Sequence, residues 1–373
     1  MQTVQPRKKG FNQSVLDYFD GVRSEDLRRL FARDATRAYR VLTRDHAEAE
    51  PTGRVARFFH RAKVLFLGMS AKLTPARRLL FVLALLFAFL GQAKFSAVID
   101  EANVRVDFSP MWYLLAIATL VFLLALELVD RVLVRDELEV ARELQRDLLP
   151  KAMPAVPGFA FAHSYRTANE VGGDYYDVRV MADGRVAVVI GDASGHGMAA
   201  GLLMATAHAA LNLAVEIDPR PELVATLVNR VLCRTGDRHA FMSLFFAVLD
   251  PATGALDYVC AGHPFPLHRR PSGASTELGT GGLPLGIRES VELVTGSARL
   301  EPGDTLLLYS DGLPEAIDRA GREFGFERLR TLLTPGGEPA ALHARVVAAL
   351  EAHLAGEPPQ DDVSVLVVHR QAA

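Results

Sequence analysis

Two long stretches with almost no charged side chains stand out in the first third of the chain. The first, Leu79–Leu90, has no charge and no helix breaker, and its apolar character continues, with one lysine, to Ile99. The second, Met111–Val129, has Glu127 as its one ionisable group. A helix that crosses a bilayer needs about 20 residues, and each stretch reaches that length when its less apolar end is included. The pattern predicts a transmembrane helical hairpin over residues 79–130.

Charges beside these stretches indicate the orientation of the hairpin. Seven Lys and Arg side chains lie between residues 54 and 78, and Arg131 and Arg135 follow the second stretch. The intervening loop balances two basic side chains against three acidic ones. Because basic side chains flank the cytoplasmic ends of spanning helices, we predict a multi-pass protein of the plasma (inner) membrane with both termini cytoplasmic. The alternative is a pair of buried helices in a soluble domain, which the all-round apolar pattern disfavours.

The segments on either side of the hairpin are polar. Residues 1–78 are rich in Arg, and apolar spacing predicts an amphipathic helix over Ser24–Leu42, to which we assign no function. In residues 131–150, apolar positions recur at heptad spacing up to Val140, which predicts a linker helix continuous with the second stretch. This helix either pairs with a second copy, giving a homodimer, or lies alone on the following domain. Both alternatives stay open.

The remaining residues, 151–373, alternate short apolar runs with tight turns. Asp183-Gly184 between two such runs is a hairpin signal, and short links indicate antiparallel pairing. Separate helical patterns lie at 196–215, 221–235, 326–333 and 340–354. The pattern predicts an α+β domain with strands at Phe159–Tyr165, Tyr175–Val180, Val186–Gly191, Met242–Leu249, Leu256–Ala261, Thr305–Tyr309 and Val363–His369.

Four acidic clusters lie at the edges of these strands, each beside Gly or a turn. Strand edges can aim side chains at one point, and converging carboxylates repel one another unless a cation pairs with them. Oxygen ligands favour Mg²⁺ or Mn²⁺ over Zn²⁺, and the two cysteines form neither a zinc spacing nor a disulfide framework. The pattern predicts a divalent-cation site built from Gly172-Gly173-Asp174, Gly191–Gly197, Ser310-Asp311-Gly312 and Gln360-Asp361-Asp362.

These clusters belong to a series of short blocks: ARELQRDLLP at 141–150, NEVGGDYYD at 169–177, VIGDASGHG at 189–197, AGHP at 261–264, GLPLG at 282–286, LYSDGLPEA at 308–316, FGFERL at 324–329 and QDDVSV at 360–365. In this order the blocks resemble the metal-dependent protein phosphatases (PPM type, the protein phosphatase 2C superfamily), and within them the bacterial SpoIIE/RsbU group. The resemblance implies an αββα sandwich of two antiparallel sheets flanked by helices, here preceded by the transmembrane hairpin and the linker helix.

The resemblance also implies a site for two divalent cations, Mn²⁺ or Mg²⁺, at one edge of the paired sheets. Asp192 would bridge both cations. Asp174 and the carbonyl of Ala193 would bind one of them, and Asp311 and Asp361 the other. The cations would activate a water for in-line attack on phosphorus, with Asp192, Asp174 and Asp311 as the catalytic residues.

Five further residues near these blocks receive lesser roles. Asp362 is an alternative to its neighbour as a cation ligand. Ser194 has no evident base partner and is interpreted as a turn residue. His196 is assigned to the helix start and His263 to turn and core hydrogen bonding. Arg166, near the Asp174 block, is the first candidate for a phosphate clamp.

The resemblance implies a phosphoprotein phosphatase that acts on the phosphoserine or phosphothreonine of a regulatory protein, an anti-sigma factor antagonist in this group, in membrane-linked signalling by partner switching. The net charge of −3 gives no basic face for nucleic acid. One alternative is a catalytically weak scaffold that binds a signalling partner through the same surface. Another is a phosphoesterase for small molecules.

Overall fold

A computed structural model describes the protein at residues 53–93, 96–99, 104–235, 240–333 and 338–372. The chain divides into two compact units, Met1–Val132 and Leu133–Ala373. The helix predicted over Ser24–Leu42 lies outside the described residues.

The two apolar stretches of the first unit are helical, and helix α4 (Arg54–Lys72) precedes them. The first stretch lies in α5 (Pro75–Gln92). The first residue of α5 is a proline, which suits a helix start because its missing N–H needs no partner there. A short antiparallel ribbon of β1 (Ser96–Ile99) and β2 (Val104–Asp107) follows. No sequence pattern predicts this ribbon. Helix α6 (Ser109–Leu148) is continuous over 40 residues, so the second apolar stretch and the linker form one helix.

Within the first unit, α5 and α6 are joined by ion pairs and close packing. Arg77 Nη1 on α5 lies 3.0 Å from Glu127 Oε1 and 2.6 Å from Asp130 Oδ2 on α6. At Gly91 an added Cβ would lie 2.9 Å from the ring of Tyr113, so the small residue permits close approach of the two helices. These contacts fix an antiparallel helix pair.

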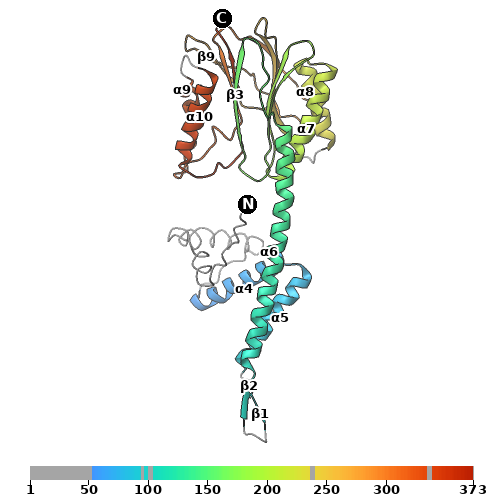
Figure 1. Cartoon of the computed structure of the whole chain (residues 1–373), viewed down its shortest axis with the longest axis vertical. Coiled ribbons are helices and arrows are strands. Elements are labelled where there is room, and N and C mark those ends of the chain that lie inside the picture. Colours follow the sequence, from blue (N-terminus) through green and yellow to red (C-terminus); the bar gives the residue numbers. More distant parts are fainter. Residues whose placement is uncertain (1–52, 94–95, 100–103, 236–239, 334–337, 373) are drawn as a thin grey trace, which may run out of the picture. The chain divides into compact units, whose positions relative to one another are not determined.

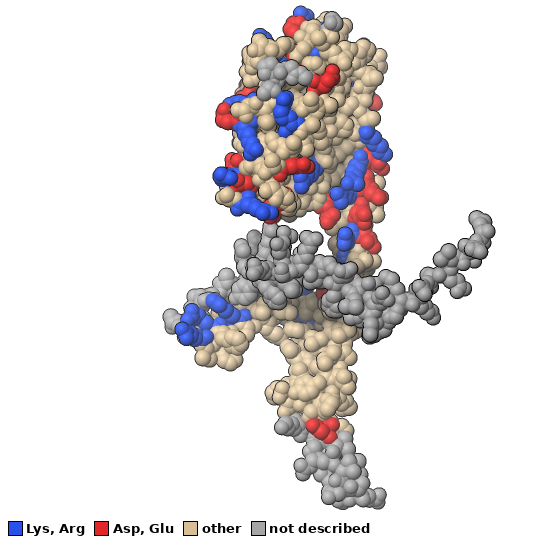
Figure 2. Space-filling view, turned by 60° about the vertical axis from the view of Figure 1, so that its left-hand side comes forward, with Lys and Arg blue, Asp and Glu red and all other residues tan. Residues whose placement is uncertain are grey.

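Most of the apolar surface of this helix pair is exposed. Only 11% of the most apolar 18-residue stretch of α5, and 6% of that of α6, is buried. Figure 2 shows a broad band without Lys, Arg, Asp or Glu on this part of the surface. Both helices are long and apolar enough to cross a membrane.

The second unit contains two five-stranded antiparallel sheets. The first has the strand order β10-β7-β6-β5-β4 and the second β3-β12-β11-β8-β9. The strands are β3 (Phe159–Arg166), β4 (Asp174–Val180), β5 (Val186–Ala193), β6 (Met242–Leu249), β7 (Ala255–Ala261), β8 (Leu267–Arg269), β9 (Ser275–Glu277), β10 (Thr295–Arg299), β11 (Thr305–Tyr309) and β12 (Val363–Arg370).

Helices cover the outer face of each sheet, as Figure 1 shows. Helices α7 (Met198–Ile217) and α8 (Pro221–Thr235) pack on the first sheet, and α9 (Phe326–Leu332) and α10 (Pro339–Leu354) lie on the second. Side chains from both sheets and from α7 and α8 share one apolar core, and a second core lies beneath α9 and α10. The predicted αββα sandwich is confirmed.

Helix α7 also has the length and apolarity of a spanning helix, but 39% of its most apolar stretch is buried against the domain. It begins at Met198, two residues later than predicted, because Gly195 and Gly197 adopt positive φ values of 96° and 67° and keep the preceding turn non-helical. Strand β5 correspondingly runs on to Ala193. The short strands β8, β9 and β10 are not predicted by the apolar pattern.

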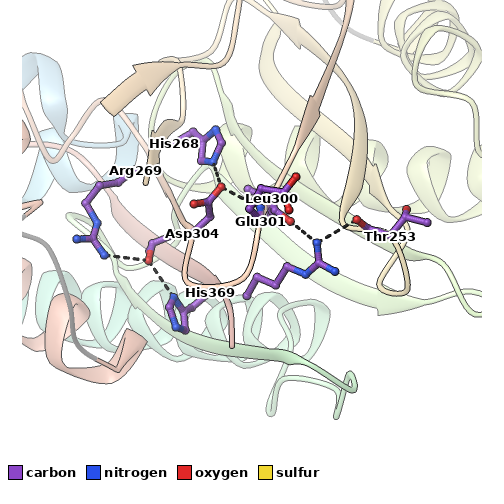
Figure 3. A network of polar contacts seen from close by, with 9 residues as sticks. Thr253, His268, Arg269, Leu300, Glu301, Asp304 and His369 are labelled. Atoms are coloured by element: carbon purple, nitrogen blue, oxygen red, sulfur yellow. Dashed lines mark hydrogen bonds and ion pairs between the residues drawn. The ribbon is translucent and has the colours of Figure 1, made fainter. Parts of the chain in front are cut away.

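A buried polar network joins three strands of the second sheet at the end that holds the start of β11 (Figure 3). The carboxylate of Asp304 accepts hydrogen bonds from His268 Nε2 (2.8 Å) and from the backbone N–H of Glu301 (2.9 Å). The hydroxyl of Thr305 lies 3.0 Å from His369 Nδ1 on β12. This network joins the ends of the three strands at the end of the sheet that lies opposite the acidic clusters.

Candidate active site

The four acidic clusters lie at the same end of the two sheets. Asp174 begins β4 and stands opposite Asp192 in the antiparallel register with β5. Asp311 follows the end of β11, and Asp361 precedes β12. Because β11 and β12 are antiparallel neighbours, the end of one lies beside the start of the other, and Ser310 N donates to the carbonyl of Ser364 across this point (3.1 Å).

The carboxylates influence one another electrostatically. Burial raises the pKa of Asp192 to about 9, with further contributions from the charges of Asp174, Asp311, Asp361 and Asp362. Burial, assisted by the charges of Asp362 and Asp311, raises the pKa of Asp174 to about 8. Burial and the charges of other acidic side chains raise the pKa of Asp311 to about 6. The structure therefore brings all four predicted clusters together at one end of the two sheets, and this group of carboxylates (Asp174, Asp192, Asp311, Asp361 and Asp362) is called the acidic edge below.

Two of these carboxylates have buried oxygens without a hydrogen-bond partner among the described residues, Asp174 Oδ2 and Asp311 Oδ1. Asp174 is only 1% exposed. An unpaired buried carboxylate oxygen is costly unless a proton or a cation satisfies it. Gly173 adds room beside them, because a Cβ there would lie 2.5 Å from the carbonyl oxygen of Ala193 and 3.0 Å from Asp192 Oδ1. This all-oxygen donor set fits a hard divalent cation.

Among the described residues, no three His, Cys, Asp or Glu side chains are already close enough to enclose a single ion. A cation at this edge would therefore also take ligands from water and from a backbone carbonyl, as small hard cations commonly do. The carbonyl of Ala193, at the end of β5 and close to Gly173, is placed to be such a ligand.

Asp361 and Asp362 have different surroundings. The carboxylate of Asp362 is buried and accepts backbone hydrogen bonds from Ala168 (2.7 Å) and Gly173 (2.6 Å). Asp361 is exposed and accepts a hydrogen bond from the backbone N–H of Asp362 (2.8 Å). The carboxylate of Asp362 is thus committed to holding the loop before β4, a role that no sequence motif indicates.

The remaining predicted residues are placed as follows. Ser194 exchanges hydrogen bonds with the backbone of Phe241, as expected of a turn residue. His196 is exposed in the turn before α7. His263 Nδ1 lies 2.8 Å from the hydroxyl of Ser243, and burial lowers the pKa of His263 to about 3, so the imidazole is neutral. Arg166 ends β3 and lines a hollow of about 310 Å³ with two arginines of α6.

One residue of this region was assigned no role from sequence. Gln145, in the last turn of α6, is 5% exposed and hydrogen-bonds to both backbone groups of Gly172, two residues before Asp174. It lies within the block ARELQRDLLP, but a glutamine in a charged helix carries no signal of its own.

Comparisons with known proteins identify the family of the chain. The family model "Stage II sporulation protein E (SpoIIE)" matches residues 182–371, just over half of the chain. The chain belongs to the SpoIIE family. The match begins after Asp174, so the place of that residue in the site rests on the strand register and not on the family match.

Individual SpoIIE-family relatives are distant from this chain in sequence. Phosphoserine phosphatase RsbU of Bacillus subtilis (strain 168) is 28% identical over 189 residues, covering 50% of this chain and 56% of that protein. The chain spans about half the length of the curated relatives that it matches.

Two solved structures share the fold. The SiaA-PP2C domain of Pseudomonas aeruginosa has a TM-score of 0.58 and 22% identity, covering 64% of this chain and 98% of that domain. The RsbU and RsbW domains of a Mycobacterium tuberculosis protein have a TM-score of 0.50 and 27% identity, covering 60% of this chain and 63% of that one. The second unit therefore has the PP2C fold.

Proposed function

We propose that this chain is a divalent-cation-dependent protein serine/threonine phosphatase. The observation that carries the proposal is the acidic edge, where carboxylates from four strand ends lie together. Asp174, Asp192 and Asp311 have raised pKa values there, and Asp174 and Asp311 have unpaired buried oxygens. Membership of the SpoIIE family and the likeness to a protein named phosphoserine phosphatase support this activity.

The residues that would hold two cations are Asp174 with the carbonyl of Ala193, Asp311 with Asp361, and Asp192 between the two sets. When bound, Mn²⁺ or Mg²⁺ supplies activation of a water and neutralisation of charge on the phosphoryl oxygens. The chain itself brings the carboxylates to the same end of the two sheets, since each of them lies at or beside the end of a paired strand. Asp361 is favoured over Asp362, whose oxygens already bind backbone amides.

The substrate that we propose is a phosphoserine or phosphothreonine on a regulatory protein, specifically an anti-sigma factor antagonist. The name of the RsbU relative and the presence of RsbU and RsbW domains together in one solved chain support a signalling role. We also propose that α5 and α6 span the plasma membrane with both termini in the cytoplasm, and that α6 pairs with a second copy. The exposed apolar surface of both helices and the basic flanks support this topology.

The test is turnover by the full chain in detergent, with Mn²⁺ or Mg²⁺, on three probes: a phosphoserine peptide, a phosphothreonine peptide and ATP. We expect hydrolysis of the peptides, abolished by EDTA and by Asp192→Asn. Preference for ATP would indicate a phosphoesterase for small molecules. Complete inactivity of a folded wild-type protein that binds Mn²⁺ would favour the scaffold alternative and overturn the proposal.

A further inference from the structure

The loop that leads into Asp174 has no strand or helix to satisfy its backbone. Between the end of β3 and the start of β4, its polar groups are bound by side chains from elsewhere. Asp362 accepts from Ala168 and Gly173, and the carbonyl of Gly173 accepts from the backbone N–H of Ala193 (3.2 Å). Further hydrogen bonds to the backbone of this loop come from α6.

Gln145 binds Gly172 through both ends of its amide. Its Nε2 donates to the carbonyl of Gly172 (2.6 Å), and the N–H of Gly172 donates to its Oε1 (3.0 Å). The same Nε2 lies 3.2 Å from the hydroxyl of Tyr165. A side-chain amide that pairs with one peptide group in this way fixes both its position and its rotation.

The neighbours of this contact leave little freedom for the loop. A Cβ on Gly172 would collide with the carboxylate of Asp362 and the hydroxyl of Tyr165, so the peptide is confined between α6, β3 and the start of β12. On the helix side, Leu149 is buried in the main core and Leu148 packs against it, which anchors the end of α6. The position of Gly172 is therefore set by where the last turn of α6 sits.

We propose that Gln145 is a positioning residue that couples the last turn of α6 to the cation site by fixing the Gly172 peptide and hence the direction of Asp174. The inference rests on the proposed function of the acidic edge as a cation site. Removal of a group that orients a metal ligand without binding the metal itself typically lowers cation affinity or activity about 10- to 100-fold. Any movement of α6 that breaks the two hydrogen bonds would have the same effect as removing the side chain.

The experiment uses the full chain in detergent and compares the wild type with Gln145→Leu and Gln145→Asn. Leucine preserves the apolar packing but loses both hydrogen bonds, and asparagine keeps the amide but is one methylene too short to reach. Mn²⁺ binding is followed directly from the loss of the free Mn²⁺ signal in electron paramagnetic resonance. The Mn²⁺ concentration for half-maximal turnover of the phosphoserine peptide is measured in parallel.

The matched control is Asn229→Leu. Asn229 is also a buried helical amide that binds a loop backbone, donating to the carbonyls of Arg288 and Glu289 and accepting from Gly286. That loop carries none of the proposed cation ligands. Asn229→Leu tests the general cost of removing a buried amide that holds a loop. We expect it to lower the melting temperature without changing the affinity for Mn²⁺.

We expect both Gln145 variants to need about 10- to 100-fold more Mn²⁺ for binding and for turnover, with activity recovering at high Mn²⁺. Mn²⁺ binding curves that coincide with the wild type in both variants would overturn the inference, as would an equal shift in Asn229→Leu. If the wild type binds Mn²⁺ but hydrolyses neither peptide, the proposed function fails, and the binding curves still decide the role of Gln145.

Discussion

Asp174 at the start of β4 lies directly opposite Asp192 near the end of β5. Residues paired in this way have Cβ atoms about 4.5–5.5 Å apart, and like charges there destabilise the strand pair. Two carboxylates facing each other across buried strands are tolerated only if protons or cations lie between them. The fold therefore maintains a repulsive pair at the position where cation binding is proposed.

The stability of the cation-free protein should fall as the pH rises from 7 to 9. Asp174 and Asp192 have pKa values of about 8 and about 9 in the folded chain, against an ordinary value of 3.8. The folded state thus binds more protons than the unfolded state in this range, and these carboxyls lose their protons as the pH rises through the folded pKa values. The measurement is the melting temperature in EDTA at pH 7, 8 and 9.

Saturating Mg²⁺ should remove most of this slope, because the cation replaces the protons. Asp192→Asn should also reduce it, since one raised carboxyl and its repulsion of Asp174 are lost. The range above pH 7 avoids buried histidines such as His263, whose pKa is lowered from 6.5 and whose effect on stability lies below that value. A melting temperature in EDTA that is constant or rises with pH would contradict the assignment.

Asp361 and Asp362 should respond differently to substitution. Asp361→Asn should reduce turnover and Mn²⁺ affinity by more than the roughly 10- to 100-fold typical of supporting groups, with little change in the melting temperature. Asp362→Ala leaves the buried amide of Gly173 and the half-buried amide of Ala168 without a partner, and the buried amide alone costs about 1–3 kcal/mol. Denaturant unfolding together with Mn²⁺ titration separates the two effects. Equal loss of stability in both variants would contradict the distinction.

The network around Asp304 should matter for stability and not for cation binding. Asp304 is 1% exposed, and Asp304→Ala leaves His268 and the N–H of Glu301 without their acceptor. We expect a loss of about 1–3 kcal/mol from the buried imidazole of His268 and a smaller one from the part-buried N–H of Glu301, with an unchanged Mn²⁺ concentration for half-maximal turnover. A shifted Mn²⁺ requirement would show that this end of the second sheet is coupled to the acidic edge.

The proposed topology predicts which surface positions a membrane-impermeant maleimide reaches in intact cells. In a chain with Cys233 and Cys260 replaced by alanine, Phe108→Cys, between β2 and α6, should be labelled from outside. Asp183→Cys, in the turn between β4 and β5, should be labelled only after the membrane is opened. The reverse pattern would invert the topology, and equal labelling of both in intact cells would argue against a spanning hairpin.

The fold class follows from local patterns, because alternating apolar runs and short turns determine antiparallel hairpins without reference to distant residues. The αββα arrangement and the meeting of the four acidic clusters were expected from the order of the blocks. Local patterns missed β8, β9 and β10, which are three to five residues long; β9 is exposed along its whole length and β10 at alternate positions, so neither shows a buried apolar run.

The parts of the site that sequence could not provide depend on contacts between distant residues. Asp361 and Asp362 are adjacent in the chain and alike in type, and only the amides of Ala168 and Gly173, nearly 200 residues earlier, distinguish them. Gln145 is recognisable only once the peptide of Gly172 lies beside it. Neither contact leaves a periodicity or a spacing that can be recognised in one sequence.

The last strand of the chain, β12, lies inside the second sheet, between β3 and β11. During synthesis, β3 and β11 therefore have no shared neighbour until residues 363–370 have left the ribosome. Asp361 and Asp362 immediately precede that strand. A chain that ends before them therefore lacks both the exposed carboxylate of Asp361 and the side chain of Asp362, which holds the loop before β4. A chain truncated before β12 should therefore lack the proposed phosphatase activity.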